Sequence, residues 1–368
     1  SDCISQENVV MVPDWEVTSI ENTDLANSLA IDNDGNLYLA GKKVQKFDSE
    51  GVEDLSWNKT FDYVAYGVDT DSQGNVYVVG YSSKVSAEYV SSGNRLHNDW
   101  KIVKYSPSGV EQWSESVDGG YTQWQTGSGD DQARSVVVDS QDNIYVSGDG
   151  ENIYQNQYPD HNGWVRKYNS EGGPFLWENI FSVNGDGEIY SSVIDNQDNL
   201  IIGGYDYVYN KSNYTNYHDY FVRKYSLANT LSWEKTYDSS NTKSELIYSV
   251  DVDSQDNIYV AGRTYNSYPL VKKYNASGNE VDFVGGNYGM VSDMGIGYIK
   301  ALTVDSNDNV YVGYTVKNRY SNSSKYDWVI KKYSSSGDEL DFGDYPLCDG
   351  TGDICSTNNL DIVLDGNL

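Results

Sequence analysis

Apolar and polar residues alternate over short stretches along almost the whole chain. The segment 75–80, Asn-Val-Tyr-Val-Val-Gly, is typical, because β-branched and aromatic residues dominate it and Gly ends it. Asn-Gly, Asp-Asn and Ser-Gly pairs separate such runs and favour tight hairpins. No longer stretch has the periodicity of a helix. The pattern therefore predicts an all-β protein built from short strands.

One unit of this pattern occurs six times. In each copy an apolar strand leads into a turn of the form Asp-x-x-[Asp/Gly]-Asn, and a second strand follows that ends near Gly. A third strand ends in Lys and an aromatic residue, and a fourth carries Trp or Phe. The turn aspartates are Asp32, Asp71, Asp139, Asp195, Asp253 and Asp305, and the lysines are Lys46, Lys104, Lys167, Lys224, Lys273 and Lys332. Each unit thus predicts four strands, which we call a, b, c and d.

The repeated polar residues are expected to be part of the blade design. The turn Asp accepts backbone N–H groups, and Gly or Asp tolerates the left-handed position that closes the turn. A Lys present in all six copies is more readily explained as a partner for an acidic group, or as a cover for an aromatic neighbour, than as a ring of cations in a channel.

Four-stranded units that recur every 40 to 70 residues or so are typical of β-propeller blades. The motif Val-Asp-Ser-Gln-Asp-Asn-Ile-Tyr-Val-Ala-Gly at 252–262 resembles the bacterial beta-propeller repeat (SBBP) family and, more loosely, NHL repeats. The resemblance covers about 28–347. It implies a propeller that serves as a binding module, a scaffold or, in some members, a lyase.

We expect three parts in the chain. Residues 1–27 form an N-terminal strand and linker, 28–347 the six-repeat propeller, and 348–368 a Cys-containing tail with a terminal strand. Three arrangements of the ends remain open. The terminal strands clasp a ring of six blades, or together they form an incomplete seventh blade, or one of them pairs with another subunit.

Charge narrows the choice of partners. The chain has 55 acidic and 25 basic residues, with a formal net charge of −30. Such a charge excludes a phosphate backbone as partner and disfavours anionic membranes. No apolar run is long enough to span a bilayer. The partners that remain are glycans and proteins, including other copies of this chain, provided that cations, strand pairing or covalent links overcome the repulsion.

Long b–c links in units two, three, four and six place the elaborated loops on one face of the propeller. These loops combine Tyr with Asn, Ser and Gly, a composition typical of recognition surfaces for sugar rings or proteins. Packing of the loops on one another explains the same composition. The candidate ligand-binding residues are Tyr154, Tyr158, Tyr207, Tyr209, Tyr214, Tyr217 and Trp124.

Metal ions are a second possibility on that face. His97, His161 and His218 lie six or seven residues before the repeated Lys in three consecutive units, so they could share a metal or supply a general base. Common descent of the repeated units explains the same sequence positions, with the three histidines far apart in space. We favour the latter, because blades splay apart while a metal needs ligands within about 2.0–2.3 Å. Calcium is the cofactor that the excess of acidic residues would suit.

The cysteines and the first residue bear on localisation. Cys3, Cys348 and Cys355 allow one disulfide and one remaining thiol, with the pairing open. Ser1 at the start fits removal of a signal peptide, so we expect a secreted or cell-surface protein.

Two hypotheses about function follow. The first is a non-catalytic extracellular binding or scaffold protein, alone or as a self-assembling surface or filament subunit. The second is a lyase or hydrolase that acts on polysaccharide through the face carrying the histidines. Motifs of serine hydrolases, nucleotide-binding loops and zinc proteases do not occur in the sequence.

Overall fold

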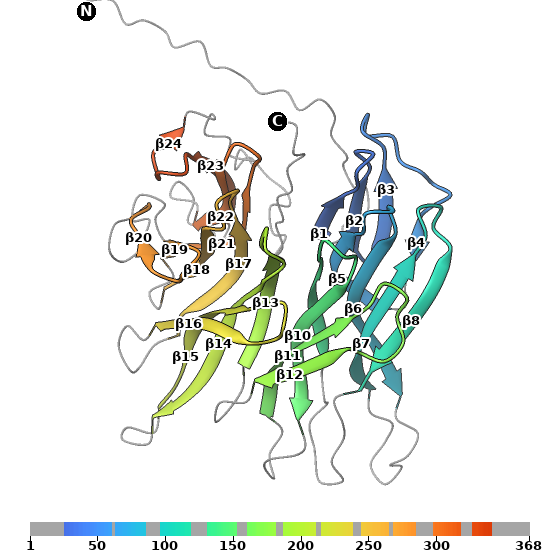
Figure 1. The fold of residues 1–368 in the computed structure, drawn as a ribbon, viewed down its shortest axis with the longest axis horizontal. Coiled ribbons are helices and arrows are strands. Elements are labelled where there is room, and N and C mark those ends of the chain that lie inside the picture. Colours follow the sequence, from blue (N-terminus) through green and yellow to red (C-terminus); the bar gives the residue numbers. More distant parts are fainter. Residues whose placement is uncertain are drawn as a thin grey trace, which may run out of the picture.

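The computed structural model is all-β, with six four-stranded antiparallel sheets arranged as the blades of a ring (Figure 1). This confirms the predicted six-bladed propeller. Within the part of the chain that is described, no helix is long and apolar enough to cross a membrane. The described residues are 26–60, 63–85, 96–118, 131–152, 160–181, 187–210, 215–237, 244–264, 268–284, 297–317 and 326–340.

The first three blades follow the chain in order. Blade one comprises β1 (Ala26–Ile31), β2 (Leu37–Gly41), β3 (Lys43–Phe47) and β4 (Lys59–Thr60). Blade two comprises β5 (Tyr63–Thr70), β6 (Val76–Val85), β7 (Leu96–Tyr105) and β8 (Glu111–Val117). Blade three comprises β9 (Gln132–Val138), β10 (Ile144–Asn152), β11 (Asp160–Tyr168) and β12 (Trp177–Phe181).

The remaining three blades repeat the plan. Blade four comprises β13 (Gly187–Ile194), β14 (Leu200–Asn210), β15 (Thr215–Tyr225) and β16 (Leu231–Tyr237). Blade five comprises β17 (Leu246–Val252), β18 (Ile258–Arg263), β19 (Pro269–Tyr274) and β20 (Glu280–Val281). Blade six comprises β21 (Gly297–Val304), β22 (Val310–Lys317), β23 (Tyr326–Tyr333) and β24 (Glu339–Leu340).

The first strand of each blade is the inner strand. Consecutive inner strands contact one another from β1 through β5, β9, β13 and β17 to β21. Alternate side chains of each sheet pack against the blades on either side, and this packing forms the core. Trp100 of blade two and Trp164 of blade three, for example, are both buried with ring centroids 5.8 Å apart.

The turn aspartate organises each a–b hairpin as predicted. In blade two, Asp71 Oδ1 accepts the N–H groups of Gln73 and Asn75 at 3.0 and 2.8 Å. Asp71 Oδ2 accepts the Tyr77 hydroxyl at 3.0 Å and lies 3.6 Å from Lys104 Nζ. The carboxylate thereby joins the turn, strand b and strand c of one blade, and its lone pairs are satisfied within the protein.

The predicted structural role of the repeated Lys is confirmed in blades two to six. In blade three, Lys167 Nζ lies 3.1 Å from Asp139 Oδ2 and 4.5 Å from the centre of the Tyr145 ring. Equivalent ion pairs join Lys104 to Asp71, Lys224 to Asp195, Lys273 to Asp253 and Lys332 to Asp305. These lysines therefore hold strand c to the a–b turn.

The residue that closes the a–b turn also links neighbouring blades. Asp142, with a φ of 61°, accepts Ser72 N–H of the preceding blade on Oδ1 at 2.9 Å. Asp198, Asp256 and Asp308 accept the equivalent bonds from Ser140, Asn196 and Ser254. The acidic turns thus form hydrogen-bonded links from blade two to blade six.

Every inner strand contains one β-bulge at the same place. The bulged residue lies five positions before the turn aspartate: Asn27, Tyr66, Arg134, Tyr190, Tyr248 and Lys300. Strand b presents glycine opposite the bulge in blades one to five, and Tyr314 in blade six. A Cβ atom on Gly80, Gly148, Gly204 or Gly262 would lie within 2.0 Å of a backbone oxygen of the inner strand.

Two acidic side chains join inner strands to each other. Asp69 Oδ2 accepts Val138 N–H at 2.9 Å, and Asp251 Oδ2 accepts Val304 N–H at 2.8 Å. Burial raises the pKa of Asp69 to about 7 and that of Asp251 to about 6, although both accept backbone hydrogen bonds that act in the opposite direction. Two of the many carboxyl groups thus titrate near neutrality.

Both chain ends lie outside the described residues. Ring closure by terminal strands, the incomplete seventh blade, pairing in trans and the cysteine pairing therefore stay predictions.

Gly262→Ala is expected to lower the free energy of unfolding by about 3 kcal/mol or more, because the added methyl meets Leu246 O at 1.9 Å. Gly173→Ala is the matched control. Gly173 has a φ of 84° but no atom within 4 Å of its added Cβ, so this substitution should cost only about 1 kcal/mol. Urea denaturation of both variants measures the difference. Equal losses would show that the bulge does not require glycine.

The double variant Asp69→Asn/Asp251→Asn should change how stability depends on pH. With folded pKa values above the ordinary 3.8, the native state binds more protons than the unfolded state between pH 4 and 7. These two groups therefore make the wild type less stable as pH rises through that window. Denaturation at pH 4.5 and 7.5 should show the variant gaining relative to wild type at the higher pH. A difference that is constant with pH would contradict the assigned pKa shifts.

Candidate functional site

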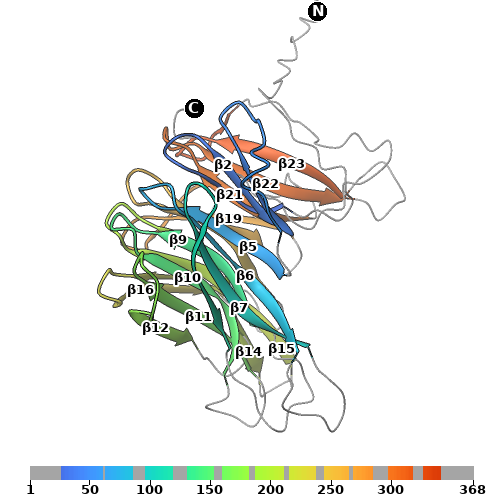
Figure 2. The same ribbon diagram turned by 90° about the vertical axis from the view of Figure 1, so that its right-hand side faces the viewer.

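The bulges place six side chains around the axis of the propeller. The bulge lies in the N-terminal half of each inner strand, at the end where the d–a and b–c links leave the blade. The long β6–β7 and β14–β15 hairpins project on this same side (Figure 2). All six bulged side chains are half-buried. We call Tyr66, Arg134, Tyr190, Tyr248 and Lys300 the axial arc.

Members of the axial arc contact one another from blade to blade. The Arg134 guanidinium carbon lies 6.0 Å from the ring centre of Tyr66 and 4.8 Å from that of Tyr190. The rings of Tyr190 and Tyr248 are 5.2 Å apart, and Lys300 Nζ lies 4.4 Å from the Tyr248 ring centre. Cations and aromatic rings therefore alternate over part of a continuous surface that spans five blades.

A second layer supports the arc from strand b. It consists of the residues that directly follow the bulge-facing glycines of blades two to five: Tyr81, Asp149, Tyr205 and Arg263. Tyr66 packs on Tyr81 with ring centres 5.6 Å apart, and Tyr190 packs on Tyr205 at 5.9 Å. Tyr81, Asp149 and Tyr205 each contact the axial residue of their own blade.

Arg134 is the electrostatic anchor of the arc. Its Nε donates to Asp149 Oδ1 at 2.5 Å, and its NH2 group lies 2.9 Å from Glu188 Oε2. Although desolvation lowers the pKa of Arg134, Asp149 and Glu188 raise it above its ordinary value. Glu188 Oε1 also accepts the Tyr205 hydroxyl at 2.7 Å. This cation is therefore compensated by two carboxylates inside the protein.

Lys300 and Arg263 have different surroundings. Desolvation lowers the pKa of Lys300, and the positive charges of Arg263 and Arg134 lower it further. Arg263 Nε is buried and has no hydrogen-bond partner within the described ranges. At the end of the arc formed by blades five and six, positive charges therefore repel one another.

The arc tyrosines remain neutral hydrogen-bond donors. Burial, and then the negative charge of Glu188, raise the pKa of Tyr190 and of Tyr205 well above the ordinary value. Burial likewise raises the pKa of Tyr66. Protonated hydroxyls, ring faces and cations together suit a ligand that has a ring and an anionic group.

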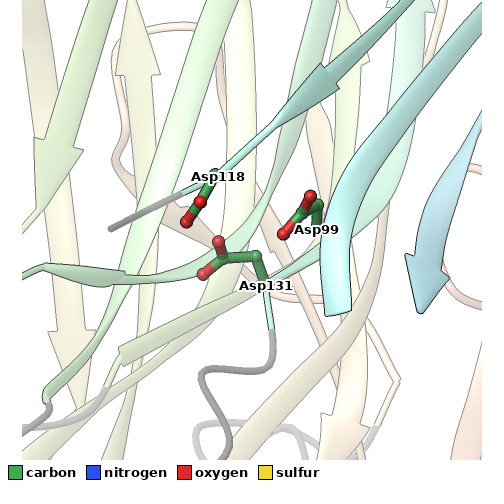
Figure 3. A group of neighbouring side chains, drawn as sticks. All are labelled: Asp99, Asp118 and Asp131. Carbon is green, nitrogen blue, oxygen red and sulfur yellow. The ribbon is translucent and has the colours of Figure 1, made fainter. Parts of the chain in front are cut away.

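Three carboxylates form a separate cluster between blades two and three. Asp99 of β7, Asp118 after β8 and Asp131 before β9 have oxygens within 4.8 Å of one another, and they point toward a common centre (Figure 3). Asp99 and Asp131 are buried, and Asp118 is exposed. Oxygen ligands of this kind suit a hard cation such as calcium and not zinc. Calcium binding at these three carboxylates stays a prediction.

The structure describes only part of the predicted ligand and metal set. Tyr154, Tyr158, Tyr214 and Trp124 lie outside the described residues. Tyr207 and Tyr209 belong to β14 and Tyr217 to β15, which places their backbone on the long-hairpin face. The roles assigned to these residues stay predictions.

The three histidines occupy strand c of three consecutive blades: His97 in β7, His161 in β11 and His218 in β15. Only the His218 side chain is described, and its ring centre lies 4.4 Å from that of Tyr205. His218 is thus connected through Tyr205 and Tyr190 to the axial arc. A shared histidine metal site stays a prediction.

The axial arc itself was missed from the sequence. Its signal is a fixed spacing, because each axial residue stands five positions before the turn Asp and each opposing glycine ends the apolar run of strand b. An aromatic or basic residue interrupts an otherwise apolar inner strand at that spacing in five copies.

Comparisons with known proteins give only weak similarities. No family model and no curated protein matches the chain. Virginiamycin B lyase from Staphylococcus aureus is 8% identical over 86% of this chain and 94% of its own, with a TM-score of 0.47. A streptogramin B lyase is 10% identical over 87% and 93%, with a TM-score of 0.46. YCF48 bound to a D1 peptide is 8% identical over 90% and 86%, with a TM-score of 0.45. Similarity at this level says nothing about what this chain binds.

Arg134→Met is expected to destabilise the protein by about 3 kcal/mol, because it leaves the buried Asp149 and the half-buried Glu188 without their cation. Adding Asp149→Asn should restore part of the loss, since one uncompensated charge is then removed. Chemical denaturation of the single and double variants measures both effects. A double variant no more stable than Arg134→Met would contradict the role of Arg134 as electrostatic anchor.

Proposed function

We propose that this chain is an extracellular, non-catalytic binding propeller that holds its ligand at the axial arc, on the face carrying the long hairpins. The observation that carries the proposal is the alignment of the inner-strand bulges, five of which aim an aromatic or cationic side chain at the axis. The ligand class is a glycan, which the exposed edges of tyrosine rings and their hydroxyls suit.

Two features support binding as the purpose of the arc. The bulges recur with a glycine opposite them, although glycine in a strand weakens it and gives no packing in return. The arc residues are also held by contacts to the second layer, such as Arg134 to Asp149, so their positions are fixed before a ligand arrives. Preorganisation of this kind reduces the entropy lost on binding.

The alternative is a lyase or hydrolase that acts on polysaccharide at the same face. The observation in its favour is the stack of His218 on Tyr205, which places one imidazole next to the second layer of the arc. His218→Ala decides between the two. Under the binding proposal the wild type releases no product from any glycan that it binds, whereas the alternative predicts a product whose release His218→Ala abolishes.

The experiment is a glycan array containing neutral and acidic saccharides, probed with the full chain. We expect binding to a defined set of glycans, a loss of about tenfold or more in affinity with Tyr248→Ala, and substantial retention with Tyr248→Phe, which keeps the ring. Val110→Ser, on an exposed c–d turn of the opposite face, is the control and should bind normally.

No glycan bound by the folded wild type, or equal binding by Tyr248→Ala and the wild type, would contradict the proposal. Thermal denaturation of each variant shows that a loss of binding is not a loss of fold.

A further inference from the structure

Strands b and c are shorter in blade five than in blade four. Strands β14 and β15 of blade four have 11 residues each, whereas β18 and β19 of blade five have 6 each. The b–c link of blade five begins at Thr264, whose N–H donates to Tyr268 O at 2.9 Å. At roughly 3.3 Å per residue, the blade five hairpin is shorter by about 15 Å. The described strands of blade five therefore extend less far beside the axial arc than those of blade four.

Two cations lie where blades five and six meet. Arg263 is the last residue of β18, and Lys300 is the bulged residue of the next inner strand, β21. Desolvation and the charge of Arg263 lower the pKa of Lys300. In a chain with a net charge of −30, two half-buried cations that repel each other are an electrostatic cost which a bound anion would offset.

An aromatic ring lies beside Lys300. Lys300 Nζ lies 4.4 Å from the ring centre of Tyr248, which packs on Tyr190 at 5.2 Å. A ligand whose anion reached Lys300 and Arg263 would lay its ring along these tyrosines. The acidic surface of the rest of the protein opposes a polyanion, so the fitting ligand has one negative charge close to one ring.

We propose that the Lys300–Arg263 end of the axial arc is a carboxylate subsite for an acidic sugar residue, such as a uronate at the end of a saccharide. Lys300 contributes a point charge, and Arg263 contributes the planar group that pairs with both oxygens of a carboxylate. The inference rests on the proposed glycan-binding function and names its ligand class.

The test compares one saccharide in two charge states. The probes are a disaccharide that ends in glucuronate and the methyl ester of the same disaccharide, each titrated into the full chain by calorimetry. We expect the free acid to bind at least tenfold more tightly than the ester. Lys300→Gln and Arg263→Gln should each lower the affinity for the free acid by about tenfold and leave the affinity for the ester unchanged. Lys235→Gln, on the outer strand β16, should change neither.

Other outcomes overturn the subsite. If the acid and the ester bind with equal affinity, or if both variants lower the affinity for acid and ester alike, the cations do not recognise the carboxylate. If neither saccharide binds while neutral glycans bind on the array, the carboxylate subsite is wrong and the proposed glycan-binding function stands. A Glu-containing peptide that binds as tightly as the acid would show that the sugar ring is not recognised.

Discussion

The axial site depends on one backbone feature, the bulge of each inner strand, which faces a glycine of strand b in blades one to five. The bulge adds a residue to strand a, so the alternation of faces is broken there and one side chain is directed to the axis. In blades two to five a Cβ atom on the opposing residue would collide with the inner-strand carbonyl, as the 1.9 Å approach at Gly262 shows. Because every blade has the bulge at the same height, the axial residues of neighbouring blades meet. The site is thus a property of the ring and not of any single blade.

The charged residues are compensated differently on the two faces of the propeller. On the turn face, aspartates such as Asp71 are neutralised by backbone N–H groups and by the repeated lysines, so much of the acidic composition is structural. On the hairpin face, Arg134 is neutralised by Asp149 and Glu188, whereas Lys300 lies near other cations. The net charge of −30 disfavours nucleic acid, and the Lys300–Arg263 end of the arc is the local positive site that we propose for a carboxylate.

The fold could be predicted from the sequence because its determinants are local and repeated six times. The turn Asp, the left-handed Gly or Asp and the strand c Lys each act within about 30 residues, and the structure confirms all three. The site could not be predicted in the same way. In one copy, a Tyr before Gly67 looks like ordinary alternation, and only the register of β5 against β6 reveals that Tyr66 is unpaired. The composition of the loops indicates their tyrosines as candidates, whereas the positions of the arc residues depend on the register between strands a and b.

Hydrogen–deuterium exchange of the full chain, with and without saturating glucuronate-terminated saccharide, tests the central claim most directly. The account predicts slower exchange in peptides that contain the inner-strand bulges, above all 244–252 and 297–304, and no change in peptides of the opposite face such as 106–112. Protection confined to the outer strands or to the a–b turns, with the bulge peptides unchanged, would contradict it.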